Sequence, residues 1–134
     1  MALDDLLRRY PGAETFRFGD GPDLCAELIA LVRSGAKTAS CGAVRSFEAG
    51  EPMPVVGRRD IVLNWDGTPS LVIETVEVTR RRFDDVPEDF ALAEGEGTFA
   101  EWREGHIRYF GRNGGWSSDM ELICERFRLV EDLG

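Results

Sequence analysis

Residues Ser34–Ser40 read Ser-Gly-Ala-Lys-Thr-Ala-Ser, and they join the end of a predicted helix to the start of an extended segment. Apolar residues at helical spacing predict an amphipathic helix over residues 22–34, and Gly35 stands where a left-handed residue commonly ends a helix. The stretch then presents the amine of Lys37 and the hydroxyls of Thr38 and Ser40. An amine held near a hydroxyl shifts the pKa of either group, which is one way to activate a nucleophile.

The geometry of this stretch decides whether its polar groups meet. In a regular strand, side chains three positions apart point to opposite faces. Lys37 therefore reaches Ser40 only if the backbone after Gly35 forms a turn or an irregular strand start, and Thr38 is the competing partner. On spacing alone, an exposed lysine beside ordinary polar residues is the more common explanation of such a stretch.

Turn and cap signals divide the rest of the chain into helices and strands. Asp66-Gly67 predicts a hairpin between two strands, and Thr98 with Glu101 predicts a capping box at a helix start. The predicted helices are 3–10, 22–34 and 87–113 with a break at 95–97; the predicted strands are 60–65, 71–79, continued by 80–85, and 119–130. Residues 16–18 are expected to be extended and 48–57 to form a loop. Helices before and within a run of strands indicate an α+β fold, and a small barrel-like sheet with helices packed at its side fits this order.

Length and composition are those of a globular domain. The chain has 134 residues, of which 43% are hydrophobic and 31% charged. No apolar run is long enough to cross a bilayer, and the N-terminus lacks the layout of a signal peptide. We therefore expect a single domain over residues 1–134, in the cytoplasm, without a membrane partner.

The net charge is −9, from 25 acidic and 16 basic residues. A negative protein repels a polyanion at long range, so duplex DNA is not expected as a partner. Arginines at 58–59, 80–82 and 103–112 form local basic clusters that a fold could gather in one groove, or that simply pair with surface carboxylates.

Several familiar sites are absent from the sequence. Three cysteines, Cys25, Cys41 and Cys124, form no C-x-x-C pair, which argues against a disulfide framework and a zinc site. The motifs of dinucleotide-binding folds, P-loops, zincins and α/β-hydrolases are also missing.

A few other residues are candidates for chemistry or stacking. Glu94 and Glu96 lie among small residues, and each is either a general acid/base or an ordinary acid before a helix. His106 shares a face with aromatic residues, which is more typical of a packed histidine than of a catalytic one. Trp65 and Trp116 are candidates to stack on a base, with core or rim packing as the alternative.

Taken in order, the motifs resemble the ASCH-domain family, which has a PUA-like β-barrel and is associated with RNA and nucleoside recognition. The pattern G-x-K-x-x-[ST] matches residues 35–40, with Ser40 where many members have threonine. Further similarity lies at Phe47-Glu48, Val56-Gly57, residues 93–97, residues 102–110 and residues 119–127, so it covers about 15–131. The chain is most similar to the bacterial stand-alone branch.

The resemblance implies a function and a site. Some members remove the acyl group from N4-acetylcytidine with a lysine, a threonine and a glutamate, which fall here on Lys37, Ser40 and Glu94. The implied mechanism has Lys37 take the proton of Ser40, whose oxygen attacks the amide carbonyl, while Glu94 passes a proton to the leaving amine. The residues expected to contact substrate are Thr38, Arg45, Glu48, Trp65, Glu96, Arg103, Trp116 and Ser118.

Two alternatives remain open. Other members are ribonucleases that use a tyrosine, the motif lysine and a later serine; Lys37 matches, Ser117 or Ser118 supplies the serine, but the tyrosine position holds Leu31. A noncatalytic RNA- or nucleotide-binding module is the third hypothesis. The expected partner is accordingly a nucleoside or single-stranded RNA, with no cofactor unless a ribonuclease uses a divalent metal. The oligomeric state is not predicted.

Overall fold

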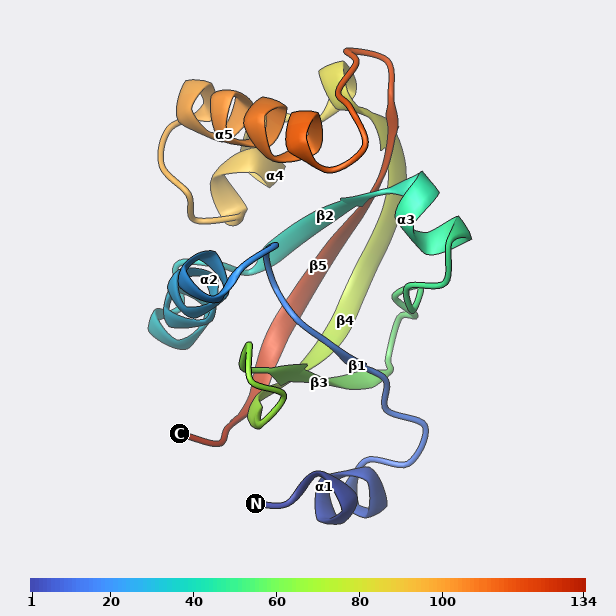
Figure 1. Cartoon of the computed structure of the whole chain (residues 1–134), viewed down its shortest axis with the longest axis vertical. Coiled ribbons are helices and arrows are strands. Elements are labelled where there is room, and N and C mark those ends of the chain that lie inside the picture. Colours follow the sequence, from blue (N-terminus) through green and yellow to red (C-terminus); the bar gives the residue numbers. More distant parts are fainter.

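The computed structural model describes residues 1–134 and has an α+β fold around one five-stranded mixed sheet (Figure 1). The strands are β1 (Thr15–Phe16), β2 (Ala39–Ala43), β3 (Arg59–Leu63), β4 (Pro69–Arg82) and β5 (Glu121–Asp132). The helices are α1 (Leu3–Arg9), α2 (Pro22–Ser34), α3 (Val44–Glu48), α4 (Glu88–Ala93) and α5 (Phe99–Arg112), with a 3-10 turn, η1, at Phe83–Asp85. The predicted α+β class is confirmed.

The sheet is open rather than closed. Its strand order is β1-β3-β4-β5-β2, and only the β1–β3 pairing is parallel. The edge strands β1 and β2 do not pair with each other, so the expected barrel is not confirmed. β4 and β5 are long and irregular, with register shifts at Val72/Ile73 and Thr75/Glu77. Such bulges bend and twist a strand, which lets β4 and β5 serve two separate packing regions.

Helix α2 covers the residues predicted for it. Pro22 lies in its first turn, where a missing backbone N–H costs nothing, and Gly35 ends it with φ 87°. Its buried side chains, Cys25, Leu28, Ile29 and Val32, pack in a cluster with β3, β4 and β5 residues. The Ser34–Ser40 stretch thus begins from a helix that is fixed against the sheet.

Helix α5 begins at the predicted capping box. The Thr98 hydroxyl accepts from the Glu101 N–H, and the Glu101 carboxylate accepts from the Thr98 N–H. Trp102 is buried and stacks on Phe83 with ring centroids 5.4 Å apart. Figure 1 shows α4 and α5 together at one end of the molecule, α1 at the other end, and α2 between them.

Some elements differ from the prediction. β4 ends at Arg82 and η1 follows, so residues 83–85 turn away from the sheet. The sequence did not indicate the short helix α3 or the strand β2 as separate elements. None of the helices combines the length and the apolar character that crossing a membrane requires.

Candidate active site

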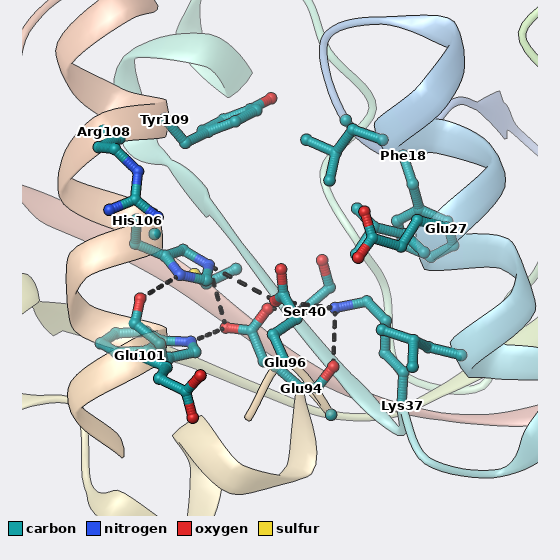
Figure 2. A pocket seen from close by; sticks show the side chains of 18 of the residues that line it. Phe18, Glu27, Lys37, Ser40, Glu94, Glu96, Glu101, His106, Arg108 and Tyr109 are labelled. Atoms are coloured by element: carbon teal, nitrogen blue, oxygen red, sulfur yellow. Dashed lines mark hydrogen bonds and ion pairs between the residues drawn. The ribbon is translucent and has the colours of Figure 1, made fainter. Parts of the chain in front are cut away.

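A cavity of about 550 Å³ lies between α2, β2, the α4–α5 loop and α5 (Figure 2). Its lining includes all three residues expected to be catalytic, Lys37, Ser40 and Glu94, together with Glu96. Figure 2 shows Lys37 entering from the α2 side and His106 from the α5 side, with Glu94 and Glu96 between them.

The backbone after Gly35 is irregular, as the meeting of Lys37 and Ser40 required. Residues 36–38 belong to no helix or strand, and β2 begins at Ala39. The Lys37 N–H donates to the Leu31 carbonyl at 3.0 Å. Because Lys37 precedes the strand that holds Ser40, the alternation of a regular strand does not separate them, and both side chains reach the cavity.

The α4–α5 loop approaches this backbone very closely. The Thr38 N–H donates to the Ala93 carbonyl at 2.8 Å, which ties the loop to the start of β2. Gly95 has φ 77°, and a Cβ at this position would lie 2.5 Å from the Ala36 carbonyl oxygen. Only glycine satisfies both conditions, and the approach places Glu94 and Glu96 beside Lys37.

Glu94 is a buried carboxylate with donors on both oxygens. Its Oε1 accepts from Lys37 Nζ at 3.2 Å and its Oε2 from Trp102 Nε1 at 2.8 Å, while His106 Nε2 lies 3.6 Å from Oε2. Burial by itself raises the pKa of Glu94, but Lys37, His106 and Trp102 outweigh that effect and lower the pKa to about 2. Glu94 is therefore held in the ionised form at neutral pH.

Glu96 and His106 complete a network of charges. Glu96 Oε2 lies 3.7 Å from Lys37 Nζ and 3.9 Å from His106 Nε2. Burial, reinforced by the charge of Glu94, raises the pKa of Glu96. Burial lowers the pKa of His106, but Glu94, Glu96 and the Trp102 carbonyl raise it more, so its pKa lies above the usual value. The site thus alternates two carboxylates with two basic groups.

The other residues expected to contact substrate lie outside this cavity: Thr38, Arg45, Glu48, Trp65, Arg103, Trp116 and Ser118. Thr38 and Ser118 are exposed and bond through their backbone, and Glu48 is exposed at the end of α3. The structure does not bring these residues together with Lys37.

The four aromatic and basic residues in that set have structural neighbours of their own. Arg45 donates to the carbonyls of Asn113 and Gly115, and Arg103 pairs with Asp84. Trp116 packs edge-on against Phe83, and its buried Nε1 has no partner. Trp65, 41% exposed, lies in the β3–β4 turn beside Arg17.

Other residues near the site were not predicted from the sequence, or were predicted to have a different role. His106, expected to be a packed residue, does stack on Trp102 but also lines the cavity. Tyr109 and Arg108 follow it on α5, and helical spacing from His106 was the one signal for Tyr109. Glu125 pairs with Ser40 across the β2–β5 ladder and lines a neighbouring cavity that Ser40 also borders, and only knowledge of the strand pairing predicts this position.

A metal ion was expected only under the ribonuclease hypothesis. Cys41, Glu94 and His106 offer donor atoms within 4.8 Å of one another. Burial raises the pKa of the Cys41 thiol well above its usual value. The Glu94 carboxylate already forms an ion pair with the Lys37 ammonium. Because a divalent cation would have to displace that ammonium, we assign no metal ligands, and the metal requirement stays an untested prediction.

A family model described as the ASCH domain matches residues 14–131. The chain belongs to the ASCH-domain family. This confirms the resemblance inferred from the ordered motifs. The crystal structure of an ASCH domain from Lactobacillus crispatus is 32% identical with a TM-score of 0.80, over 93% of this chain and 84% of that one. Protein EF3133 from Enterococcus faecalis is 30% identical with a TM-score of 0.82, over 95% of this ASCH-domain chain and 84% of its own.

More distant similarity extends to an ASCH protein from Zymomonas mobilis. Its structure is 9% identical to this ASCH-domain protein with a TM-score of 0.54, over 90% of this chain and 70% of that one. This relation shows a shared fold. A search among curated proteins finds no match.

Proposed function

We propose that this ASCH-domain protein hydrolyses the amide bond of an N4-acylated cytidine or a similar acylated nucleoside. Ser40 is the nucleophile, Lys37 exchanges its proton, and Glu94 positions Lys37. The observation that carries the proposal is the buried Lys37–Glu94 ion pair, which lies in the wall of a cavity that Ser40 also lines.

The burial of this pair favours a functional role. The side chains of Lys37 and Glu94 are 1% and 2% exposed, so both charges have lost nearly all contact with water. The desolvation of such a pair often exceeds its attraction, and apolar residues of similar volume frequently stabilise a fold as well or better. Ionisable groups kept buried beside a cavity are typical of active sites, and the lowered pKa of Glu94 agrees with this.

The size and charge of the cavity favour a small substrate. Its volume of about 550 Å³ lies within the usual range of about 300–1,000 Å³ for small-ligand sites. Its carboxylates are Glu27, Glu94, Glu96, Glu101 and Glu104, and its basic groups are Lys37, His106, Arg108 and Arg112. This balance offers little attraction for a chain of phosphates and is compatible with an uncharged nucleoside.

The proposed chemistry follows serine hydrolases in outline. Lys37 releases one proton to the cavity solvent and then accepts the proton of Ser40, whose oxygen attacks the amide carbonyl. Phe18 and Tyr109 provide aromatic surface in the lining on which a base can stack.

An assay of the purified protein with N4-acetylcytidine tests the proposal. We expect cytidine and acetate as products, and a loss of about 10²–10⁴-fold in kcat/KM for Lys37→Ala, the usual range for a general base. Ser40→Ala should lose activity at least as strongly. Arg33→Ala is the control, because Arg33 pairs with Asp132 outside the cavity. No turnover by the wild type, or unchanged turnover by Lys37→Ala, would contradict the proposal.

The ribonuclease alternative has less support. Leu31, at the position where that hypothesis needs a tyrosine, lines the cavity, and Ser118 lies outside it. Short single-stranded RNA, with and without a chelator, belongs in the same assay: fragments that Lys37→Ala abolishes would favour this alternative. Salt-sensitive binding without products would favour the binding-module hypothesis instead.

A further inference from the structure

We propose that His106 donates the proton to the leaving nitrogen in this reaction, and that Glu94 and Glu96 keep its imidazole in the cationic form. The inference rests on the proposed amide hydrolysis, and it transfers to His106 the proton-donor role that the family resemblance implies for Glu94.

Glu94 is poorly placed to carry a proton. Oε1 accepts from the Lys37 ammonium and Oε2 accepts from the Trp102 indole N–H. The indole can only donate, and Lys37 can accept only after it has lost its own proton, so in the resting site neither oxygen of Glu94 faces an acceptor for a carboxylic O–H. Both donors stabilise the carboxylate, which suits Glu94 for holding cations rather than for passing protons.

The contacts of His106 define its tautomer and its charge. Nδ1 lies 2.8 Å from the Trp102 carbonyl oxygen. A carbonyl accepts only, so Nδ1 carries a hydrogen, and Nε2 is the nitrogen that faces the carboxylates. It lies 3.6 Å from Glu94 Oε2 and 3.9 Å from Glu96 Oε2. Without a proton, Nε2 would direct its lone pair at two carboxylates; with one, it is attracted to both.

The surroundings hold the ring and leave it accessible to a substrate. The imidazole stacks on Trp102, with centroids 4.5 Å apart and planes 28° apart. Its side chain is 12% exposed, and it lines the cavity with Ser40 (Figure 2). A proton on Nε2 is therefore held in a fixed direction at the boundary of the cavity that the leaving group would occupy.

Titratable groups from several elements lie around this proton. Glu94 and Glu96 come from the α4–α5 loop, Lys37 from the α2–β2 connection, and Cys41 from β2. On α5 itself, Glu101, Glu104 and Arg108 line the same cavity. Lys37 opposes protonation of His106 by its charge, but it is itself paired with Glu94 and Glu96, which reduces that effect.

The complete reaction balances with these groups. Neutral Lys37 takes the Ser40 proton as Oγ bonds to the carbonyl carbon; the C–N bond then breaks, and the nitrogen takes the proton of His106 Nε2. Water next adds to the Ser40 ester and gives a proton to neutral His106. When the C–Oγ bond breaks, Lys37 returns its proton to Ser40. The net change is amide plus water to amine plus carboxylic acid, and every group recovers its starting state.

The leaving group provides the test. A nitrogen needs a proton to depart, whereas the nitrophenolate of p-nitrophenyl acetate departs without one. His106→Gln should therefore lose about 10²–10⁴-fold in kcat/KM on N4-acetylcytidine but less than about 3-fold on the ester. Ser40→Ala should lose both activities, which shows that the ester uses the same nucleophile. Ala100→Gln, at an exposed position on the same helix, should retain both.

Each other result overturns the inference in a recognisable way. Loss of both activities in folded His106→Gln assigns His106 a structural role, and a small loss on the amide removes it from the mechanism while the proposed function stands. A wild type inactive on the amide eliminates both proposals together.

A second measurement needs no substitution at His106. It is the only histidine in the chain, so an NMR titration of its imidazole is unambiguous. We expect the titration midpoint in the wild type above the ordinary value of about 6.5, and a lower midpoint in Glu96→Gln. Amide turnover should fall as pH rises through that midpoint, and the fall should move to lower pH in Glu96→Gln. A wild-type midpoint at or below about 6.5 would overturn the inference even if His106→Gln does not fold.

Discussion

Lys37 and Glu94 place opposite charges 3.2 Å apart in the same buried region. The cost of removing these charges from water is offset only while both are present, because each carries the other's compensating charge. A change at one residue therefore alters stability and proposed chemistry together. Activity measurements alone cannot separate the two effects, so a variant that restores neutrality is needed.

We predict that Lys37→Met destabilises the fold by about 3–5 kcal/mol, because it leaves the Glu94 carboxylate buried without its cation. The double variant Lys37→Met/Glu94→Gln should recover most of that loss, since its amide still accepts from the Trp102 indole. Urea unfolding gives the free energies, and the same preparations give kcat/KM, which should stay low in both variants.

The control for this pair is Arg33→Met, which breaks the exposed Arg33–Asp132 bridge and should cost at most about 1 kcal/mol. If the double variant is no more stable than Lys37→Met, the two charges do not compensate each other. Recovery of activity in the double variant would remove Lys37 from the mechanism.

Sequence patterns alone left the partners of Lys37 open. An irregular backbone after the helix stop at Gly35 was the condition for Lys37 to reach Ser40, and the family resemblance selected Ser40 over Thr38. The meeting with Glu94, 57 positions away, came from the family resemblance and not from spacing. The position of Glu125 opposite Ser40 depends on strand pairing. Trp65 and Trp116 were candidates by residue type alone, and neither lines the cavity.

At the scale of elements, Gly95 lies where the α4–α5 loop closely approaches the α2–β2 connection. Its neighbours Glu94 and Glu96 supply both carboxylates of the network, and the Ala36 carbonyl occupies the space of a Cβ. A larger residue must push the α4–α5 loop away from the α2–β2 connection. That movement would separate the carboxylates from Lys37.

We predict that Gly95→Ala destabilises the protein by about 1–3 kcal/mol, from the positive φ and the clash combined. It should also reduce amide turnover, although it removes no polar side chain. Gly111→Ala is a matched control on α5, where a Cβ meets nothing within 4 Å. It should be neutral or stabilising by up to about 1 kcal/mol. Equal thermal midpoints for the two variants would show that the close approach does not matter in solution.

The elements that were predicted have strong local signals. α2 has a proline start, an apolar stripe and a glycine stop, and α5 has its capping box. Strand β2 lacks such a signal, since Ala39–Ala43 contains no large apolar residue and is defined by its pairing with β5. The five-residue helix α3 is too short to show a helical period.

At the scale of the whole molecule, sheet closure and charge were the two properties to predict. Closure depends on whether edge strands meet, and β1 has only two residues with which to extend an edge. Local sequence does not encode the distance between the two edge strands. The barrel expectation therefore came from the family resemblance and the order of elements. The charge, in contrast, follows from composition, and it predicts how the protein responds to salt.

Salt distinguishes a nucleoside from an RNA strand, because only the strand releases condensed counterions on binding. With a net charge of −9 and a cavity containing five carboxylates, we predict that KM for N4-acetylcytidine changes less than about twofold between about 50 and 300 mM salt. Short single-stranded RNA should bind weakly throughout. As a reference, Lys37→Ala should leave the salt dependence of nucleoside binding unchanged. An uncharged nucleoside has no phosphate with which Lys37 could form a salt-sensitive contact. RNA affinity that falls with a logarithmic slope of about −0.7 for each phosphate contacted would instead identify the strand as the ligand and overturn the nucleoside assignment.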